Sequence, residues 1–318
     1  MKTLTKHTFA VAAVALLLLC AAASHQAQAQ TTLRLPRPSQ KSSVMQTIGV
    51  TDVSITYSRP AVKGRKIWGD PPAGAAAGTR TLDGARAAAD APLVPYGHVW
   101  RTGANEATLF EVTDNVLVNG QPLPAGRYSL HTIPGKDEWT IIFNKDDGQW
   151  GSFTYDEKKD ALRVKTKPEM VADNQEWLKF GIDPDGETAM RIALRWEKVV
   201  VPFTVEVKDV KALAMTKARM AVAAAKPDDF QTRASAANFA LQNKMNVEEA
   251  MGWLEQSIKI KETMGNVGLK ARALAEQGKT AEAIAAGEKA IQLGKDAKAN
   301  PQAIANMEKL VGEWKAKK

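Results

Sequence analysis

The chain has 318 residues, of which 44% are hydrophobic and 25% charged, and it contains one cysteine. At roughly 150 residues per domain this length predicts two domains, and the composition is close to that of ordinary globular proteins. These values exclude a wholly disordered, collagen-like or multi-span membrane chain, and the lone cysteine excludes a disulfide framework.

Residues 1–29 have the order of a secretory signal peptide. Lys2 and Lys6 precede a mostly apolar run over residues 9–23, and Ala27-Gln28-Ala29 follows it. This order predicts cleavage before Gln30 and export to the periplasm or cell envelope. A transmembrane anchor is the alternative, but the apolar run is shorter than the ~20 residues that a span requires.

Removal of the signal peptide would change the inventory of reactive side chains. Cys20, His7 and His25 leave with it, so the mature chain keeps only His98 and His131 and no cysteine. Thiol catalysis, thiolate zinc sites and iron–sulfur clusters are therefore excluded. The formal net charge falls from +8 to +6 with the loss of two lysines, and no basic block stands out. We therefore expect no nucleic-acid partner, and no membrane span after cleavage.

Composition divides the remaining chain near residue 208. All four tyrosines and six of the eight tryptophans precede this point, whereas the later stretch is rich in Ala, Lys, Glu and Gln. Aromatic residues favour strands and the latter group favours helices. We predict an α+β multidomain chain, with an antiparallel β-sandwich or jelly-roll-like domain over residues 30–208 and an all-α domain over residues 209–318.

Alternating apolar residues predict several strands in the first domain. The alternating sets are Val53, Ile55 and Tyr57; Trp139, Ile141 and Phe143; Met190, Ile192, Leu194 and Trp196; and Val201, Phe203, Val205 and Val207. Asn119-Gly120 and Asp185-Gly186 predict tight turns between strands. Residues 69–91 are rich in Ala, Gly and Pro and poor in large apolar side chains, so we expect a flexible insertion there.

The second domain shows helical stripes that recur. One stripe consists of Val247, Ala250, Met251, Leu254 and Ile258. The other consists of Ala283, Ile284, Gly287, Ala290 and Ile291, and in it Ala283 takes the place of Ala250. Asn246 with Glu249 predicts a capping box, Thr280 a helix cap, Asn300-Pro301 a helix start and Gly278 a turn between paired helices.

The spacing from Ala250 to Ala283 resembles degenerate tetratricopeptide repeats, as do the residues Leu274-Ala275-Glu276-Gln277-Gly278 and Ala290-Ile291. The resemblance implies stacked helix pairs with a concave groove that engages a peptide or protein partner. A plain bundle of helical hairpins with Ala-rich packing is the alternative.

The densest polar segment of the β domain is residues 99–108, VWRTGANEAT. The fork of Arg101 and the amide of Asn105 suit a carboxylate or sugar hydroxyls as ligand, with Glu106 beside them. The same groups also suit a purely structural loop, in which Arg101 pairs with Glu106 and Asn105 bonds turn amides.

No recognised catalytic motif accompanies this segment. Arg127, Ser129 and His131 share one face of a strand, but no orienting carboxylate is specified, so a Ser–His nucleophile is not predicted. A metal site from His98, His131 and a glutamate has no diagnostic spacing, and we predict no metal and no cofactor. Four strand aromatics, Trp139, Trp150, Tyr155 and Trp196, suit either sugar stacking or the core, and the core is the commoner place.

Several motifs in a fixed order resemble the bacterial family called domain of unknown function 2911, over about residues 39–207. The motifs are residues 46–49 (QTIG), 55–60 (ITYSRP), 63–67 (KGRKI), 94–97 (VPYG), 99–108 (VWRTGANEAT), 123–126 (LPAG) and 142–145 (IFNK). The resemblance implies an exported protein that can carry helical repeats, and residues 69–91 depart from the family pattern. It makes residues 99–108 the family's signature stretch and adds Arg59 as a candidate.

Three classes of function follow. The leading one is an exported binding or scaffolding protein without enzymatic activity, whose β domain holds a small-molecule or carbohydrate ligand through Arg59, Arg101, Asn105, Glu106 and His131. The second is a hydrolase or lyase acting on envelope carbohydrate, in which Glu106 pairs with another carboxylate. The third is a structural or assembly factor. Catalytic residues are not assigned.

Overall fold

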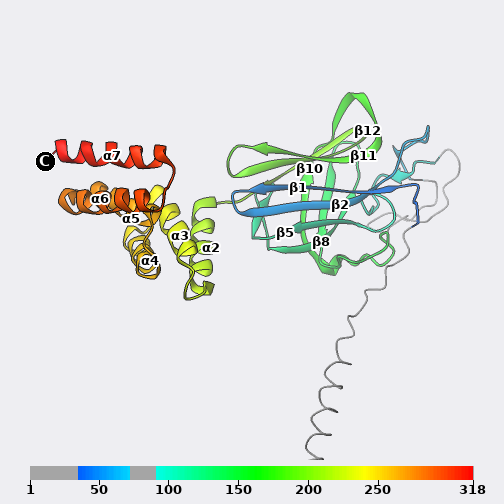
Figure 1. Ribbon diagram of the computed structural model, residues 1–318. Helices are drawn as coiled ribbons and strands as arrows, with labels where there is room; N and C mark the ends of the chain where they lie inside the picture. Colours follow the sequence, from blue (N-terminus) through cyan, green and yellow to red (C-terminus); the bar gives the residue numbers. More distant parts are fainter. Residues whose placement is uncertain (1–34, 72–90, 318) are drawn as a thin grey trace, which may run out of the picture. The chain divides into compact units, whose positions relative to one another are not determined.

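The computed structural model describes residues 35–71 and 91–317 (Figure 1). The predicted signal peptide over residues 1–29 and most of the predicted insertion over residues 69–91 lie outside the described residues. Within the described ranges, a β-rich region of antiparallel sheets is followed by helices. The predicted α+β architecture is therefore confirmed.

The larger sheet has six strands in the order β1-β2-β5-β8-β9-β10. Neighbouring strands in it are antiparallel. Its strands are β1 (Gln40–Ile48), β2 (Thr51–Arg59), β5 (Thr108–Val112), β8 (Gly126–Ile133), β9 (Trp139–Asn144) and β10 (Asp160–Thr166).

The smaller sheet has four strands in the order β11-β12-β6-β7, also antiparallel. They are β11 (Glu169–Asp185), β12 (Ala189–Glu206), β6 (Val116–Val118) and β7 (Gln121–Leu123). A separate short parallel pair, β3 (Trp68–Gly69) and β4 (Val94–Pro95), flanks the undescribed residues 72–90.

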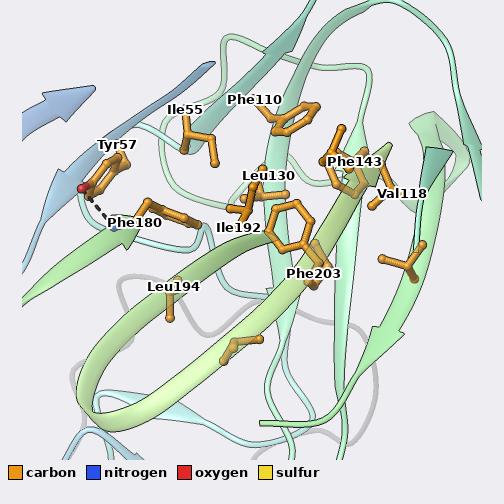
Figure 2. Packing of buried hydrophobic residues seen from close by; sticks show 14 of the residues in the cluster. Ile55, Tyr57, Phe110, Val118, Leu130, Phe143, Phe180, Ile192, Leu194 and Phe203 are labelled. Carbon is orange, nitrogen blue, oxygen red and sulfur yellow. Dashed lines mark hydrogen bonds between the residues drawn. The ribbon is translucent and has the colours of Figure 1, made fainter. Parts of the chain in front are cut away.

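Side chains from both sheets form one buried cluster (Figure 2). The predicted alternating sets all lie in it, including Ile55 and Trp139 of the larger sheet and Ile192 of the smaller one. Ring contacts join the sheets directly, since the ring centroids of Phe143 and Phe203 are 6.1 Å apart. Burying a large apolar side chain contributes roughly 1.5–3 kcal/mol, so this cluster supplies most of the stability of the β region.

A hydrogen bond also crosses between the sheets. The backbone N–H of Phe180 donates to the hydroxyl of Tyr57 at 3.0 Å, and the two rings meet edge to face at 4.9 Å (Figure 2). This bond lets the tyrosine hydroxyl be buried without the cost of an unsatisfied polar group.

The predicted turns are present. Asn119 and Gly120 have φ values of 45° and 77° between β6 and β7, and Gly186 has φ 77° between β11 and β12.

The outer face of the larger sheet is more buried than the alternation of apolar and polar residues predicts. Ile142 lies opposite His131 in the register and is fully buried although it is outside the core cluster, so this face is covered as well.

The helices described after the β region are α2 (Val210–Ala224), α3 (Phe230–Gln242), α4 (Val247–Ile260), α5 (Met264–Glu276), α6 (Thr280–Asp296) and α7 (Pro301–Ala316). Helices α3 and α4 begin at Phe230 and Val247, and helices α5 and α6 begin at Met264 and Thr280, so the corresponding helices start 34 and 33 residues apart. None of the helices in residues 35–71 and 91–317 combines the length and apolarity needed to cross a membrane.

Small residues lie where paired helices approach each other. Ala250 and Ala283, which take equivalent places in α4 and α6, are both fully buried. A Cβ atom on Gly287 would lie 2.5 Å from Cγ2 of Val311, so only glycine permits this contact between α6 and α7 without a shift.

Two of the predicted helix caps are wrong, although the helices begin at Val247 and Thr280. Asn246 has φ 42° and makes no capping bond to the backbone, because its amide bonds Glu249 instead. Thr280 lies inside α6, and Lys279 precedes it without a side-chain cap. The start at Asn300-Pro301 is confirmed by a bond to Gln302 N–H, and a capping box that we did not predict joins Thr263 and Asn266.

Candidate functional site

Residues 99–108, which we call the signature segment, form a tightly turned loop before β5. Thr102 and Asn105 have positive φ values of 57° and 61°. The hydroxyl of Thr102 lies 3.2 Å from both Trp100 O and Thr132 Oγ1, and Thr108 Oγ1 donates to Thr102 O at 2.8 Å. These internal bonds satisfy the buried threonines and fix the loop, which is why non-glycine residues hold left-handed conformations here.

A second stretch, residues 149–153, runs beside the signature segment, and we call it the paired segment. Glu106 forms a β-bridge with Trp150. Two backbone bonds flank it, from Ala107 N–H to Gln149 O at 3.1 Å and from Gly151 N–H to Asn105 O at 3.0 Å. The chain thus brings together residues that are far apart in the sequence.

Gly151 is the point of closest approach between the segments. It has φ 66°, and a Cβ atom there would lie 3.0 Å from Nη1 of Arg101 and 2.8 Å from the ring of Phe153. A larger residue would have to push the guanidinium aside. Arg101, Asn105 and Glu106 are each half-buried. The Nε of Arg101 donates to Gly103 O at 3.4 Å, and the Nδ2 of Asn105 donates to Ser39 O at 3.3 Å.

His131 lies beneath the paired segment, on the outer face of β8. Its Nε2 is 3.0 Å from Ser129 Oγ and its Nδ1 is 3.1 Å from Ser152 Oγ, and its ring centroid is 5.1 Å from that of Tyr155. Burial lowers the pKa of His131 to about 4, an effect that Asp146 only partly offsets. The imidazole is therefore neutral near pH 7, with one nitrogen donating and the other accepting.

The arrangement of Ser129 and His131 differs from a catalytic dyad in two respects. Both residues are fully buried, and the second imidazole nitrogen bonds the hydroxyl of Ser152 rather than a carboxylate. A catalytic histidine of the serine-hydrolase type needs a group that stabilises its positive charge. His131 instead links β8 to the paired segment and supports it.

Arg59 takes a different place from the other four candidates. It ends β2 on the same face as Ile55 and Tyr57, and its Nε donates to Leu178 O of β11 at 2.8 Å. Its side chain therefore bonds the smaller sheet. The signature segment lies near this strand end, because a Cβ atom on Gly103 would be 2.9 Å from Ser58 O.

The family model described as protein of unknown function (DUF2911) matches residues 39–205. This chain belongs to that family. The match covers the β region, and no family model matched the helices. No curated protein and no solved structure matches the chain.

Sequence reasoning missed two polar residues of the DUF2911 domain that the structure adds to the site. Ser152 is fully buried against His131, and Gln149 is 6% exposed, with Nε2 donating to Asp146 O at 3.2 Å. Both lie in an irregular stretch between β9 and β10, where periodicity carries no information. The only available signal was the string Gln149-Trp150-Gly151-Ser152, in which an aromatic and a glycine stand between two polar residues.

The four aromatic candidates of the DUF2911 domain separate into two groups. Trp139 and Trp196 are each 1% exposed and belong to the core. Tyr155 is half-buried and donates to Asp160 Oδ2 at 2.8 Å, and its pKa is raised, first by burial and then by Asp160. Trp150 is 54% exposed, so its indole lies at the surface, on the stretch whose backbone pairs with Glu106.

Phe153, at the other end of the paired segment, is also 54% exposed. Two exposed aromatic side chains close together on one short stretch are typical of binding surfaces. Within residues 35–71 and 91–317, no three His, Cys, Asp or Glu side chains are grouped so as to hold a metal ion.

Proposed function

We propose that this chain is an exported binding protein of the cell envelope without enzymatic activity, whose DUF2911 domain holds a small hydroxylated ligand on the surface that the paired and signature segments form together. The observation that carries the proposal is the exposed side chain of Trp150, whose neighbour Gly151 lies against the guanidinium of Arg101 and donates its N–H to Asn105 O. An indole face packs against the apolar face of a sugar ring, while a guanidinium fork and an amide bond hydroxyl or carboxylate groups.

The framework beneath these side chains supports the same proposal. The two segments are joined by backbone bonds, and the paired segment is held from below by His131 through Ser152. A site of this kind is pre-organised, so little conformational entropy would be lost when a ligand binds.

Export is part of the proposal and rests on the order of residues 1–29. The basic start, the apolar run and the Ala27-Gln28-Ala29 motif are the parts of a cleaved signal peptide. An envelope location also fits a mature chain that has no cysteine.

We also propose that the helical region engages a protein partner, as tetratricopeptide-like pairs would. Helices α3 and α5, which occupy equivalent places in the two pairs, enclose a hollow of about 160 Å³. Its lining is apolar at Leu241, Leu269 and Ala273 and polar at Asn238, Gln242, Arg272 and Glu276. Amide side chains beside an apolar floor suit an extended peptide.

Two other functions follow from the same residues. A purely structural role is favoured by the bonds of Thr102 to Trp100 O and of Thr108 to Thr102 O inside the signature segment. A carbohydrate hydrolase would require Glu106 and a second carboxylate facing each other across a cleft. The groups that join the two segments here are backbone N–H and carbonyl groups, and no second carboxylate is placed opposite Glu106 by these bonds, so the binding role has the stronger support.

A ligand screen with three variants tests the binding proposal. We expect the wild-type domain to bind a member of a panel of envelope saccharides, measured by calorimetry, and Trp150→Ala to weaken this binding about tenfold or more. Trp177→Ala is the matched control, because Trp177 is also an exposed tryptophan of the domain but lies on β11. Its affinity should equal that of the wild type.

Arg101→Ala separates binding from structure. Loss of affinity with an unchanged melting temperature supports the site, whereas a large loss of stability together with no saccharide binding by the wild type would replace the proposal with the structural role. Release of a reducing sugar from any panel member would favour the hydrolase.

A further inference from the structure

A second hollow, of about 400 Å³, lies at one edge of the β sandwich, away from the signature segment in the sequence. Its lining residues are Asn119, Gln121, Thr140, Arg163 and Lys165. Thr140 lies on β9 and Arg163 and Lys165 on β10, whereas Asn119 and Gln121 come from the turn and strand that follow β6 in the other sheet. The volume falls within the range of small-molecule sites.

The walls of this hollow are fixed by hydrogen bonds between the two sheets. Asn119 donates from Nδ2 to Lys165 O at 3.1 Å, and its Oδ1 accepts from Thr204 N–H at 2.8 Å. The amide therefore clamps the β6–β7 turn between β10 and β12. Because the lining residues stand on strands and on a bonded turn, the hollow is rigid rather than a gap between mobile loops.

Arg163 is held in one orientation at the side of the hollow. Its Nε donates to Asp160 Oδ2 at 2.6 Å and its Nη2 to Tyr155 Oη at 2.7 Å. Its bonds within the described part of the chain involve Nε and Nη2, with a further long contact from Nη2 to Glu157 at 3.4 Å. The two N–H groups of Nη1 remain for a ligand, on a guanidinium whose position is already set.

Lys165 adds a second cation that can change partner. Its Nζ is 2.6 Å from Glu138 Oε1, but the two side chains are 71% and 48% exposed. Such an exposed ion pair contributes little and exchanges readily for another anion. The five lining residues include two cations, whose carboxylate partners Asp160, Glu157 and Glu138 lie outside the lining, and Thr140 and Gln121 supply a hydroxyl and an amide.

We propose that this hollow binds a small organic anion, a carboxylate or phosphate ester carried on a hydroxylated body of about monosaccharide size. The anionic group bonds Arg163 and Lys165, and the hydroxyls of the ligand bond Thr140 and Gln121. The lining contains no aromatic ring, so recognition depends on charge and hydrogen bonds rather than on stacking. This site is independent of the proposed ligand of the signature segment.

Calorimetric titration of the full chain with three probes tests this proposal. The probes are galacturonate, galactose 6-phosphate and, as the neutral counterpart, galactose. We expect the two anions to bind at low ionic strength, galactose not to bind at concentrations up to about 10 mM, and added salt to weaken the binding of the anions.

Variants then locate the bound anion. Lys165→Ala should weaken the anion about tenfold, since a charged hydrogen bond is lost. Lys167→Ala is the control, because Lys167 is an exposed lysine shortly after Lys165 that does not line the hollow. Arg163→Lys keeps the charge but removes the fork, and it should also weaken binding while circular dichroism shows the fold retained.

Three results would overturn the proposal. One is equal binding of galactose and the anions, another is an equal loss of affinity in Lys165→Ala and Lys167→Ala, and the third is no binding of either anion to the wild type at about 10 mM.

Discussion

Replacement of His131 by alanine tests whether this buried imidazole supports the paired segment. The change removes two hydrogen bonds, of 3.0 and 3.1 Å, and leaves the hydroxyls of Ser129 and Ser152 in a region where both residues are fully buried. Each stranded hydroxyl costs roughly 1–3 kcal/mol, and removal of the ring adds a cavity. We therefore expect the free energy of unfolding to fall by about 3–5 kcal/mol.

Urea denaturation followed by tryptophan fluorescence measures this loss, because six of the eight tryptophans precede residue 208 and so report mainly on the β region. Since the chain has more than one folded region, the transition of the β region is fitted separately. Ser43→Ala is the control, because Ser43 makes an exposed bond to Thr56 in the same sheet. Its effect should stay within about 0.5 kcal/mol.

A triple variant, His131→Leu with Ser129→Ala and Ser152→Ala, sharpens the test. Replacing all three partners by apolar groups leaves no unsatisfied hydroxyl, so we expect it to recover part of the stability lost in His131→Ala. A loss below about 1 kcal/mol in His131→Ala would refute the supporting role of this residue.

Three further predictions concern pH, helix packing and export. The pKa of His131 is about 4 in the folded chain, against an ordinary value of 6.5. Its neutral form therefore contributes about 3 kcal/mol to the free energy of unfolding, which is fully present above pH 6.5 and is lost as the pH falls toward 4. In His131→Leu, this part of the curve of stability against pH should be flatter. Gly287→Ala should destabilise the helical region in a thermal melt because its Cβ would meet Val311, whereas Gly252→Ala in α4, with nothing within 4 Å, should stabilise it by about 0.5–1 kcal/mol. N-terminal sequencing of the chain from a periplasmic fraction should begin at Gln30, and an intact start at Met1 would contradict export by a cleaved signal.

The strands that the sequence predicts are those with one buried and one exposed row. Val53, Ile55 and Tyr57 alternate with polar residues, and the structure buries all three. Strand β11 was not predicted, because the alternation of Leu178, Phe180 and Ile182 is confined to its second half and its first half is polar and mostly exposed. Likewise Glu197, with φ 55°, lies inside the single strand β12, which the sequence divides into two apolar runs.

The helix spacing was predictable because small residues at helix contacts recur in the sequence, as at Ala250 and Ala283. The caps were less so, since Asn246 followed by Glu249 has the composition of a capping box but adopts a left-handed conformation that turns its side chain away from the backbone N–H groups. A local pattern gives the residue types of a cap but not the backbone conformation before it.

Only the signature segment of the candidate site was predictable from the sequence, and the paired segment was not. Residues 101–106 stand out by their polar density and by the family resemblance, whereas Gln149 and Ser152 join them through pairing that depends on the tertiary fold. The exposure of Trp150 could not be predicted from the sequence either. A tryptophan in or near a strand has the same local sequence pattern whether it lies in the core, like Trp139, or at the surface.

The binding role of the DUF2911 domain is tested most directly by nuclear magnetic resonance of its indole N–H groups during titration with the saccharide panel. The Trp150 signal is assigned by its absence in Trp150→Phe. We predict that a bound saccharide shifts the Trp150 signal and leaves those of the buried Trp139 and Trp196 in place. A Trp150 signal that stays unchanged at saturation with every panel member would contradict a ligand site on the surface that the signature and paired segments form.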